Sequence, residues 1–113
     1  MHELSIVLSI VHTVGDELKK SECSVVDEIE LEIGELSGVD LAAFDFAWGE
    51  AVKNTPLALA LRKISYPSGQ FRCMDCDHEF KSAKPVSECS QCKSYLTFAT
   101  KGKELRIKSI LAS

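Results

Sequence analysis

The sequence lacks a long apolar run, a basic segment at its start and an excess of positive charge. Because a membrane-spanning helix needs about 20 consecutive apolar residues, we expect no membrane partner. The first apolar positions follow no basic region, which is untypical of a secretory signal and predicts a cytoplasmic protein. The formal net charge of −4 argues against a nucleic-acid partner, although it does not exclude a local basic patch.

The sequence also lacks the residue combinations that support common enzyme chemistry. It contains no Ser/His/Asp or Cys/His set that we interpret as a nucleophile system, and no glycine-rich loop of the kind that binds nucleotide phosphates. We therefore expect that the protein is not an enzyme and that any nucleotide hydrolysis comes from a partner. With 113 residues, of which 45% are hydrophobic, the chain is typical of one small domain, with at most one further unit that is too small to fold alone.

Two segments have the apolar spacing of amphipathic helices. The first covers about residues 4–20, with apolar side chains at Leu4, Val7, Leu8, Val11, Val14 and Leu18. The second begins after Asp40, a residue type that often caps helices. Its aromatic residues, which we expect to pack in the core, are Phe44, Phe46 and Trp48. Pro56 disfavours helical geometry in the residue before it, so we expect this helix to end near residues 54–56.

Three segments alternate between apolar and polar residues, which is typical of half-buried strands. They cover residues 27–33, 57–66 and 104–108. The polar positions of the first strand include Glu28, Glu30 and Glu32. We interpret these glutamates as a solvated face rather than as a cation site, because their alternation with apolar residues explains the pattern fully.

Four of the five cysteines form two C-x-x-C pairs, Cys73/Cys76 and Cys89/Cys92. In a reducing compartment this arrangement indicates a metal site rather than disulfides. The two pairs supply four thiolates in a tetrahedron, the ligand set of structural Zn²⁺, and leave no open position for catalysis. The alternatives are an iron–sulfur cluster or a dithiol redox pair, and a rubredoxin-like iron site uses similar ligands. A redox C-x-x-C, however, normally occurs once.

The module that holds these cysteines is small and lies between two predicted strands. A segment of this size cannot bury enough apolar surface to fold unaided, so metal binding must supply on the order of 10 kcal/mol. We interpret His78 as a loop histidine near the site, and the unpaired Cys23 as a small residue at a turn.

The predicted order of elements is helix, strand, helix, strand, cysteine module and a last strand. This order predicts an α+β fold in which two helices pack on a three-stranded sheet, with an inserted zinc-ribbon lobe. The expected domains are residues 1–69 together with 102–113, and residues 70–101.

The first three residues, Met1-His2-Glu3, place several nitrogen donors close together. A bulky residue at position 2 generally blocks removal of the initiator methionine, so we expect the Met1 amine at the mature N-terminus. That amine, the amide nitrogens of His2 and Glu3 and the His2 imidazole can surround a cation in a plane, which selects Ni²⁺ or Cu²⁺. By spacing alone, a solvated terminus explains His2 better than a metal site.

The full set of motifs adds a resemblance. The N-terminal Met1-His2-Glu3-Leu4-Ser5, the loop Gly34-Glu-Leu-Ser-Gly38 and the two cysteine pairs together resemble the HypA/HybF family of nickel metallochaperones in [NiFe]-hydrogenase maturation. The resemblance implies a nickel-binding α+β lobe and a zinc lobe. It implies that Met1, His2 and Glu3 bind Ni²⁺ as cargo, and that Asp40 matches a family aspartate close to that site.

The resemblance also implies partners. These are a HypB-type GTPase, a hydrogenase large subunit and, in some relatives, urease maturation proteins; we expect a monomer or weak homodimer. One departure concerns the residues after the cysteine pairs, where many family members carry histidine and this chain carries Asp77 and Lys93. The alternative function is a zinc-ribbon adaptor or nucleic-acid-associated module without nickel.

Overall fold

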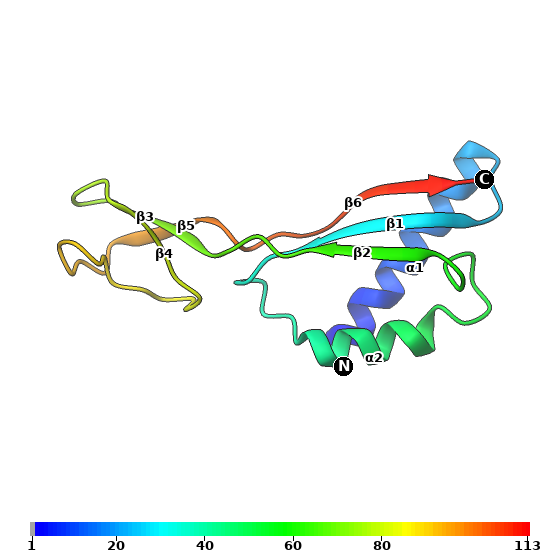
Figure 1. Ribbon diagram of the computed structural model, residues 1–113, viewed down its shortest axis with the longest axis horizontal. Helices are drawn as coiled ribbons and strands as arrows, with labels where there is room; N and C mark the ends of the chain where they lie inside the picture. The colour runs from blue at the N-terminus through cyan, green and yellow to red at the C-terminus, as the bar shows by residue number, and fades with distance from the viewer. Residues whose placement is uncertain (1) are drawn as a thin grey trace. The chain divides into compact units, whose positions relative to one another are not determined.

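The computed structural model describes residues 2–113, so Met1 lies outside the described part of the chain. The elements, in order, are α1 (His2–Ser21), β1 (Val26–Ile33), α2 (Leu41–Ala51), β2 (Leu61–Ser65), β3 (Gln70–Cys73), β4 (Glu79–Lys81), β5 (Thr97–Lys101) and β6 (Leu105–Ala112) (Figure 1). None of the helices described here is long and apolar enough to cross a membrane.

The chain divides into two compact units. The first unit comprises the residues up to Leu31 together with Val39–Lys63 and Ile107–Ser113, and the second comprises Glu32–Gly38 and Ile64–Arg106. Residues 70–101, the predicted ribbon segment, all belong to the second unit.

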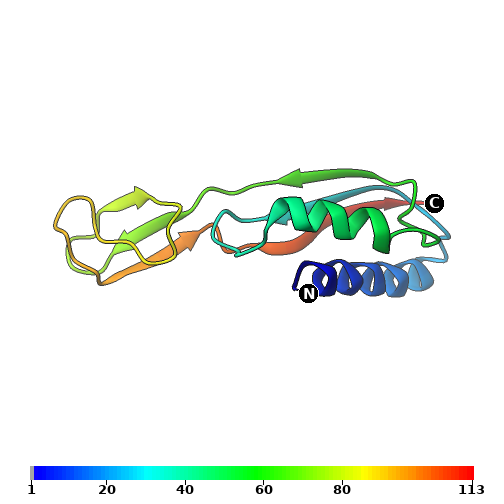
Figure 2. The ribbon, with the colours of Figure 1, turned by 90° about the horizontal axis from the view of Figure 1, so that it is seen from below.

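The two helices and one three-stranded sheet make the predicted α+β arrangement, which is confirmed. The strand order is β2-β1-β6, and α1 and α2 lie side by side (Figure 2). On β1 the apolar residues Ile29, Leu31 and Ile33 are buried, whereas the residues between them are partly exposed. The buried residues of α1, Val7, Val14 and Leu18, are spaced at helical intervals. The buried faces of α1 and β1 therefore contribute to the core.

The aromatic residues of α2 do not all pack in the core as expected. Phe44 is fully buried and its ring centroid lies 6.0 Å from that of Trp48. The Arg62 guanidinium lies over both rings, at 5.8 and 5.3 Å from their centroids. Phe46, by contrast, is 71% exposed, so its predicted core position is wrong. Residues four apart share a helix face, whereas a residue midway between them points to the other side.

The glutamates of β1 face outward and form ion pairs with the neighbouring strands. Glu28 pairs with Lys63 of β2 at 2.8 Å. Glu30 and Glu32 pair with β6, through Lys108 at 3.7 Å and Arg106 at 3.0 Å. Exposed pairs of this kind contribute little to stability, but they balance the charge of an acidic strand. This arrangement agrees with the interpretation of the glutamates as an outward face of the strand.

The predicted strand over residues 57–66 is too long at its N-terminal end. Residues before Leu61 form turns, in which Thr55 Oγ1 accepts from the Leu57 N–H at 3.2 Å and the Ala60 N–H donates to the Leu57 carbonyl at 3.2 Å. Leu57 is 1% exposed and Leu59 is 97% exposed, so these two leucines do not share a buried face as alternate residues of a strand would. The last strand, in contrast, extends past the predicted residue 108 to Ala112.

The second unit contains its own antiparallel sheet, in the order β4-β3-β5. Phe71 on β3 is opposite Phe80 on β4, and their rings stack with centroids 5.7 Å apart. This stacked pair supplies much of the apolar packing next to the cysteines, because Phe71 is 3% exposed and precedes the buried Cys73 by two residues.

The loop Gly34–Gly38 is bound to the two chain segments that lead into and out of this sheet. The Glu35 N–H donates to the Pro67 carbonyl at 2.9 Å, and the Leu36 N–H donates to the Gly102 carbonyl at 2.6 Å. The Gly34 N–H donates to the Glu104 carbonyl at 2.7 Å. The Gly-Glu-Leu-Ser-Gly motif therefore joins these two segments through backbone hydrogen bonds within the second unit.

Candidate metal centres

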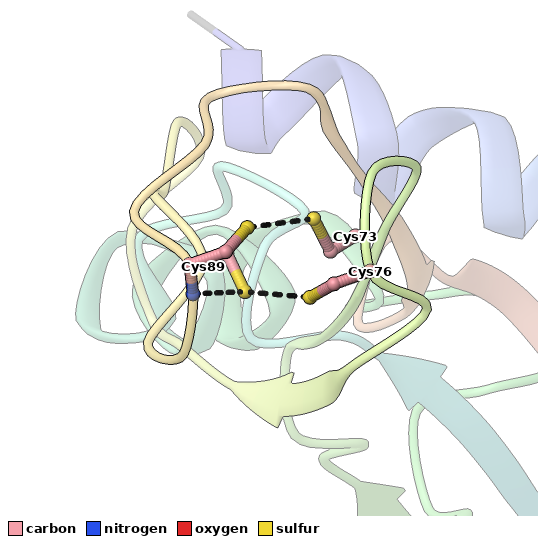
Figure 3. A group of neighbouring side chains, drawn as sticks. Cys73, Cys76 and Cys89 are labelled. Carbon is pink, nitrogen blue, oxygen red and sulfur yellow. Dashed lines mark hydrogen bonds between the residues drawn. The ribbon is translucent and has the colours of Figure 1, made fainter.

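The four paired cysteines converge on one point in the second unit. Their sulfur atoms all lie within 4.8 Å of one another. The Sγ atoms of Cys73 and Cys92 are 3.6 Å apart. Those of Cys76 and Cys89, both labelled in Figure 3, are also 3.6 Å apart. Cys73 and Cys89 are fully buried, whereas Cys92 is exposed. Among residues 2–113, this is the one group of three or more such side chains close enough to hold a metal ion.

The two C-x-x-C segments have the same local backbone structure. The Asp77 N–H donates to the Cys73 carbonyl at 3.0 Å, and the Lys93 N–H donates to the Cys89 carbonyl at 3.0 Å. Asp77 and Lys93 both adopt positive φ angles, of 60° and 67°. In addition, the Sγ atoms of Cys73 and Cys89 each accept from the backbone N–H two residues later, at 3.4 Å. Each turn therefore directs its sulfurs to the same side.

The spacing of the sulfurs fits zinc. A tetrahedral site with Zn–S bonds of about 2.3 Å has S–S edges of about 3.8 Å, close to the separations present here. Four thiolates complete the coordination of Zn²⁺ and leave no position for water. If Zn²⁺ occupies the site, the four cysteines hold it, and it links the turn between β3 and β4 to the segment before β5.

Without a cation, the four thiols cannot all ionise together. The His78 N–H lowers the pKa of the Cys76 thiol, but burial and the three neighbouring cysteines outweigh this and raise it to about 12. Burial raises the pKa of Cys89, but backbone N–H groups of Cys92 and Gln91 and the neighbouring thiols lower it to about 6. A bound metal ion must therefore displace protons, so its affinity falls in acid.

His78 lies beside the cysteines as a packing and hydrogen-bonding residue. Its Nε2 is 3.0 Å from the Ser90 Oγ, and its ring stacks on Phe80 with centroids 6.1 Å apart. These contacts link the first cysteine turn to the second.

The N-terminal site residues belong to the first unit. The His2 side chain is 62% exposed, with Nδ1 3.4 Å from the Glu3 Oε2. The same Glu3 oxygen accepts from the Asp40 N–H at 3.2 Å. Asp40 is the N-cap of α2, and its Oδ1 accepts from the Ala43 N–H at 3.1 Å. The structure thus brings His2, Glu3 and Asp40 together, while Met1 lies outside the described residues.

The side chain of Glu3 has a role that the sequence did not reveal. The Asp40 N–H lowers the pKa of the Glu3 carboxyl below its ordinary value of 4.5, with smaller contributions from its own N–H and from His2. The carboxylate therefore holds the start of α1 to the cap of α2 at neutral pH, and this link is lost as the pH falls through the lowered pKa. Because the two residues are 37 positions apart, no local signal could have found the contact.

The cap itself predicts a stability difference between two variants. Asp40→Ala removes the acceptor for the Ala43 N–H and should lower the free energy of unfolding by about 1 kcal/mol. Asp40→Asn keeps a capping oxygen and should lower it by only about a few tenths of a kcal/mol. Thermal unfolding of both variants measures the difference. Equal melting temperatures for the two would show that the cap contributes nothing.

The fold and the site define a class: a two-unit α+β protein whose second unit is a ribbon carrying a four-cysteine metal site. A family model described as "Hydrogenase/urease nickel incorporation, metallochaperone, hypA" matches residues 1–112. The chain belongs to the HypA family. HypA proteins are nickel metallochaperones that function in hydrogenase maturation and are not enzymes, so the predicted resemblance is confirmed.

Individual relatives match over almost their whole length. The "Hydrogenase maturation factor HypA" of Parabacteroides distasonis is 45% identical over 111 residues, covering 98% of this chain and 96% of the relative. The protein of the same name from Chlorobium phaeobacteroides is 34% identical, with 97% of each chain covered. Two solution structures are similar. One, of a HypA protein, has a TM-score of 0.72 at 28% identity and covers 100% of this chain and 97% of that one. The other, of the Ni metallochaperone HypA from Helicobacter pylori, has a TM-score of 0.68 at 27% identity and covers 97% of this chain and 96% of that one.

Proposed function

We propose that this chain binds one Ni²⁺ at its N-terminus and passes it on for [NiFe]-hydrogenase maturation. The proposed donors are the Met1 amine, the amide nitrogens of His2 and Glu3, and the His2 imidazole, with the Asp40 carboxylate close by. The observation that carries the proposal is the Glu3 hydrogen bond to the Asp40 N–H, which joins the start of α1 to the residue that caps α2.

The exposure of His2 suits a cargo site. A carrier must release its metal to a recipient, and an imidazole that is 62% exposed can be approached by incoming ligands. The neighbouring carboxylate of Glu3, 3.4 Å from Nδ1, is close enough to orient the ring, and nickel binding at Nδ1 replaces this contact. A buried cage would hold the ion too firmly for transfer.

The position at a helix start also supports planar nitrogen coordination. The first N–H groups of an α-helix have no carbonyl acceptor within the helix, so nickel can replace the amide protons of His2 and Glu3 without breaking the helical ladder. The helix N-terminus carries a partial positive charge that disfavours a cation. The two deprotonated amides and the nearby carboxylates of Glu3 and Asp40 offset that charge.

We further propose the partners and the resident metal. A HypB-type GTPase supplies nucleotide hydrolysis, and the hydrogenase large subunit receives the nickel. The name of the matching family model also includes urease nickel incorporation, so urease maturation proteins are a second candidate recipient. Zn²⁺ in the four-cysteine site has a structural role, because its four thiolates leave no position for a substrate.

Calorimetric titration of untagged, zinc-loaded protein with Ni²⁺ tests the proposal. We expect binding of one Ni²⁺ per chain, and a loss of affinity of more than about 100-fold in His2→Ala. Addition of one residue before Met1 displaces the amine and should cause a similar loss. Asp40→Asn, which keeps the helix cap, isolates the contribution of the carboxylate charge. Binding should weaken in acid, because nickel competes with protons for the nitrogen donors.

His12→Ala is the matched control for these variants. His12 also lies on α1 and is 82% exposed, paired with Asp16 at 3.5 Å, so its removal should leave nickel binding unchanged. If His2→Ala binds nickel as the parent chain does, the N-terminal site is wrong and nickel binds elsewhere.

A further inference from the structure

The second cysteines of the two C-x-x-C turns differ in their exposure to solvent. Cys76 and Cys92 hold the same position in turns of the same backbone structure, but Cys92 is exposed and Cys76 is only partly so. The residue two positions later also differs. After Cys76 it is His78, whose half-buried ring stacks on Phe80, whereas after Cys92 it is the smaller Ser94. Of the four paired cysteines, Cys92 is therefore the most accessible to a reagent in solvent.

A charge of opposite sign follows each of these two cysteines. Asp77 follows Cys76, and Lys93 follows Cys92; both charged residues are exposed. The Asp77 side chain is 83% exposed, and its carboxylate is 3.9 Å from the Arg72 Nε, so this ion pair balances little of its charge. A negatively charged reagent is therefore repelled at the first turn and attracted at the second.

The carboxylate of Asp75 does not remove this difference between the turns. Its Oδ2 accepts from the Ser94 Oγ, so it links the first turn to the residues that follow the second and acts on both. The change from a carboxylate at Asp77 to an ammonium group at Lys93 therefore remains as the difference in charge.

Cys73 is close to Cys92, although solvent does not reach it. Cys73 is 0% exposed, and its Sγ is 3.6 Å from the Cys92 Sγ. A disulfide has an S–S bond of about 2.05 Å, so a small movement of the two side chains brings the sulfurs to bonding distance. Cys73 can therefore complete a reaction that begins at Cys92.

We propose that Cys92 is a modification site for small disulfides that carry a net negative charge, such as glutathione disulfide. The Cys92 thiolate attacks one sulfur of the reagent, which forms a mixed disulfide and releases one thiolate. The Cys73 thiolate then attacks the Cys92 sulfur, which forms the Cys73–Cys92 disulfide and releases the second thiolate. Two protein thiolates are oxidised and one disulfide is reduced to two thiolates, so electrons and charge balance.

This reaction takes two of the four ligands away from the metal site. Cys76 and Cys89 remain, and two thiolates supply only half of a tetrahedral coordination. The modification therefore releases zinc, and reduction by excess thiol restores the site. The inference concerns the ribbon segment and does not depend on nickel binding at the N-terminus.

Peptide mapping by mass spectrometry tests the site and the order of the two steps. The zinc-loaded Cys23→Ser chain, which lacks the cysteine outside the cluster, is treated with glutathione disulfide while a chromophoric chelator measures zinc release. We expect the mixed disulfide on Cys92 first, and then the Cys73–Cys92 bond together with the loss of zinc. A first adduct on another cysteine, a different disulfide, or zinc that is retained overturns the proposal.

Two substitutions to asparagine test the role of charge. Asp77 and Lys93 both have positive φ angles, which asparagine tolerates, so Asp77→Asn and Lys93→Asn remove a charge at equivalent positions without straining the turn. At low salt we expect Lys93→Asn to slow the reaction of Cys92 with glutathione disulfide about threefold, and high salt should remove the difference. Asp77→Asn is the matched control and should not slow it.

A neutral reagent separates charge from access. With 2-hydroxyethyl disulfide, Lys93→Asn should react at Cys92 as fast as the parent chain does, because the reagent carries no charge for the ammonium group to attract. Equal rates of the parent chain and Lys93→Asn with glutathione disulfide at low salt overturn the proposal. Equal slowing of Lys93→Asn with both reagents also overturns it, since the substitution then acts through the shape of the turn.

Discussion

Removal of zinc from the full chain is expected to unfold residues 70–101 while α1 and α2 stay helical. Residues 70–101 have a small core, in which the buried side chains are Phe71, Cys73, Ser87 and Cys89. Half of these are metal ligands. The first unit instead buries large side chains from both helices and from β1, such as Phe44, Ile29 and Leu31. Zinc binding to four thiolates contributes on the order of 10 kcal/mol, which the small core cannot replace.

Amide hydrogen exchange followed by mass spectrometry measures this result. After chelation, peptides from residues 70–101 should exchange fast, whereas peptides from α1 and α2 keep their protection. Cys89→Ser, which removes a buried ligand, should reproduce the effect. Cys23→Ser removes the cysteine outside the cluster and should retain zinc and protection throughout. Unchanged protection of residues 70–101 in the metal-free chain would contradict the prediction.

Gly34→Ala is expected to destabilise the zinc-loaded chain by about 3 kcal/mol or more. A Cβ at position 34 would overlap the carbonyl group of Gly102 and lie 2.6 Å from the Glu104 Oε1. Hydrogen bonds to the backbone hold both of these groups in place. Glu104 Oε1 accepts from the Gly102 N–H at 2.8 Å, and the Gly102 carbonyl accepts from the Leu36 N–H. Any movement that relieves the overlap therefore breaks the hydrogen bonds that hold the Gly34–Gly38 loop.

Gly49→Ala is the matched control for that substitution. Gly49 lies inside α2 with nothing within 4 Å of an added Cβ, so alanine should stabilise the helix by up to about 1 kcal/mol. Thermal unfolding of both variants should therefore show melting temperatures that move in opposite directions. A Gly34→Ala chain with the melting temperature of the parent chain would show that the loop rearranges without loss of stability.

Local patterns in the sequence predicted much of this protein. The helix over residues 4–20, the strand over 27–33 and the cap at Asp40 follow from side-chain periodicity and from one capping residue, which depend on neighbours a few positions away. The cysteine spacing likewise predicted a four-sulfur cluster, because each C-x-x-C turn is itself a local structure.

Local patterns failed where the type and order of residues do not determine which side chains are buried. The alternation of leucine and alanine over residues 57–61 is typical of a strand, which would place Leu57 and Leu59 on one face, but the residues before Leu61 form turns that bury Leu57 and expose Leu59. The prediction for Phe46 failed for a related reason. Its residue type indicates the core, whereas its position on α2 directs the side chain to solvent.

The amino-acid sequence by itself determined the residues that can bind metal and most elements that carry them, because periodicity and turn chemistry are local. Only the tertiary structure decided which sulfurs approach each other and that Glu3 holds the Asp40 N–H. These are contacts between residues far apart along the chain. They depend on how the strands pair and how the helices pack, and no short stretch of sequence contains that information.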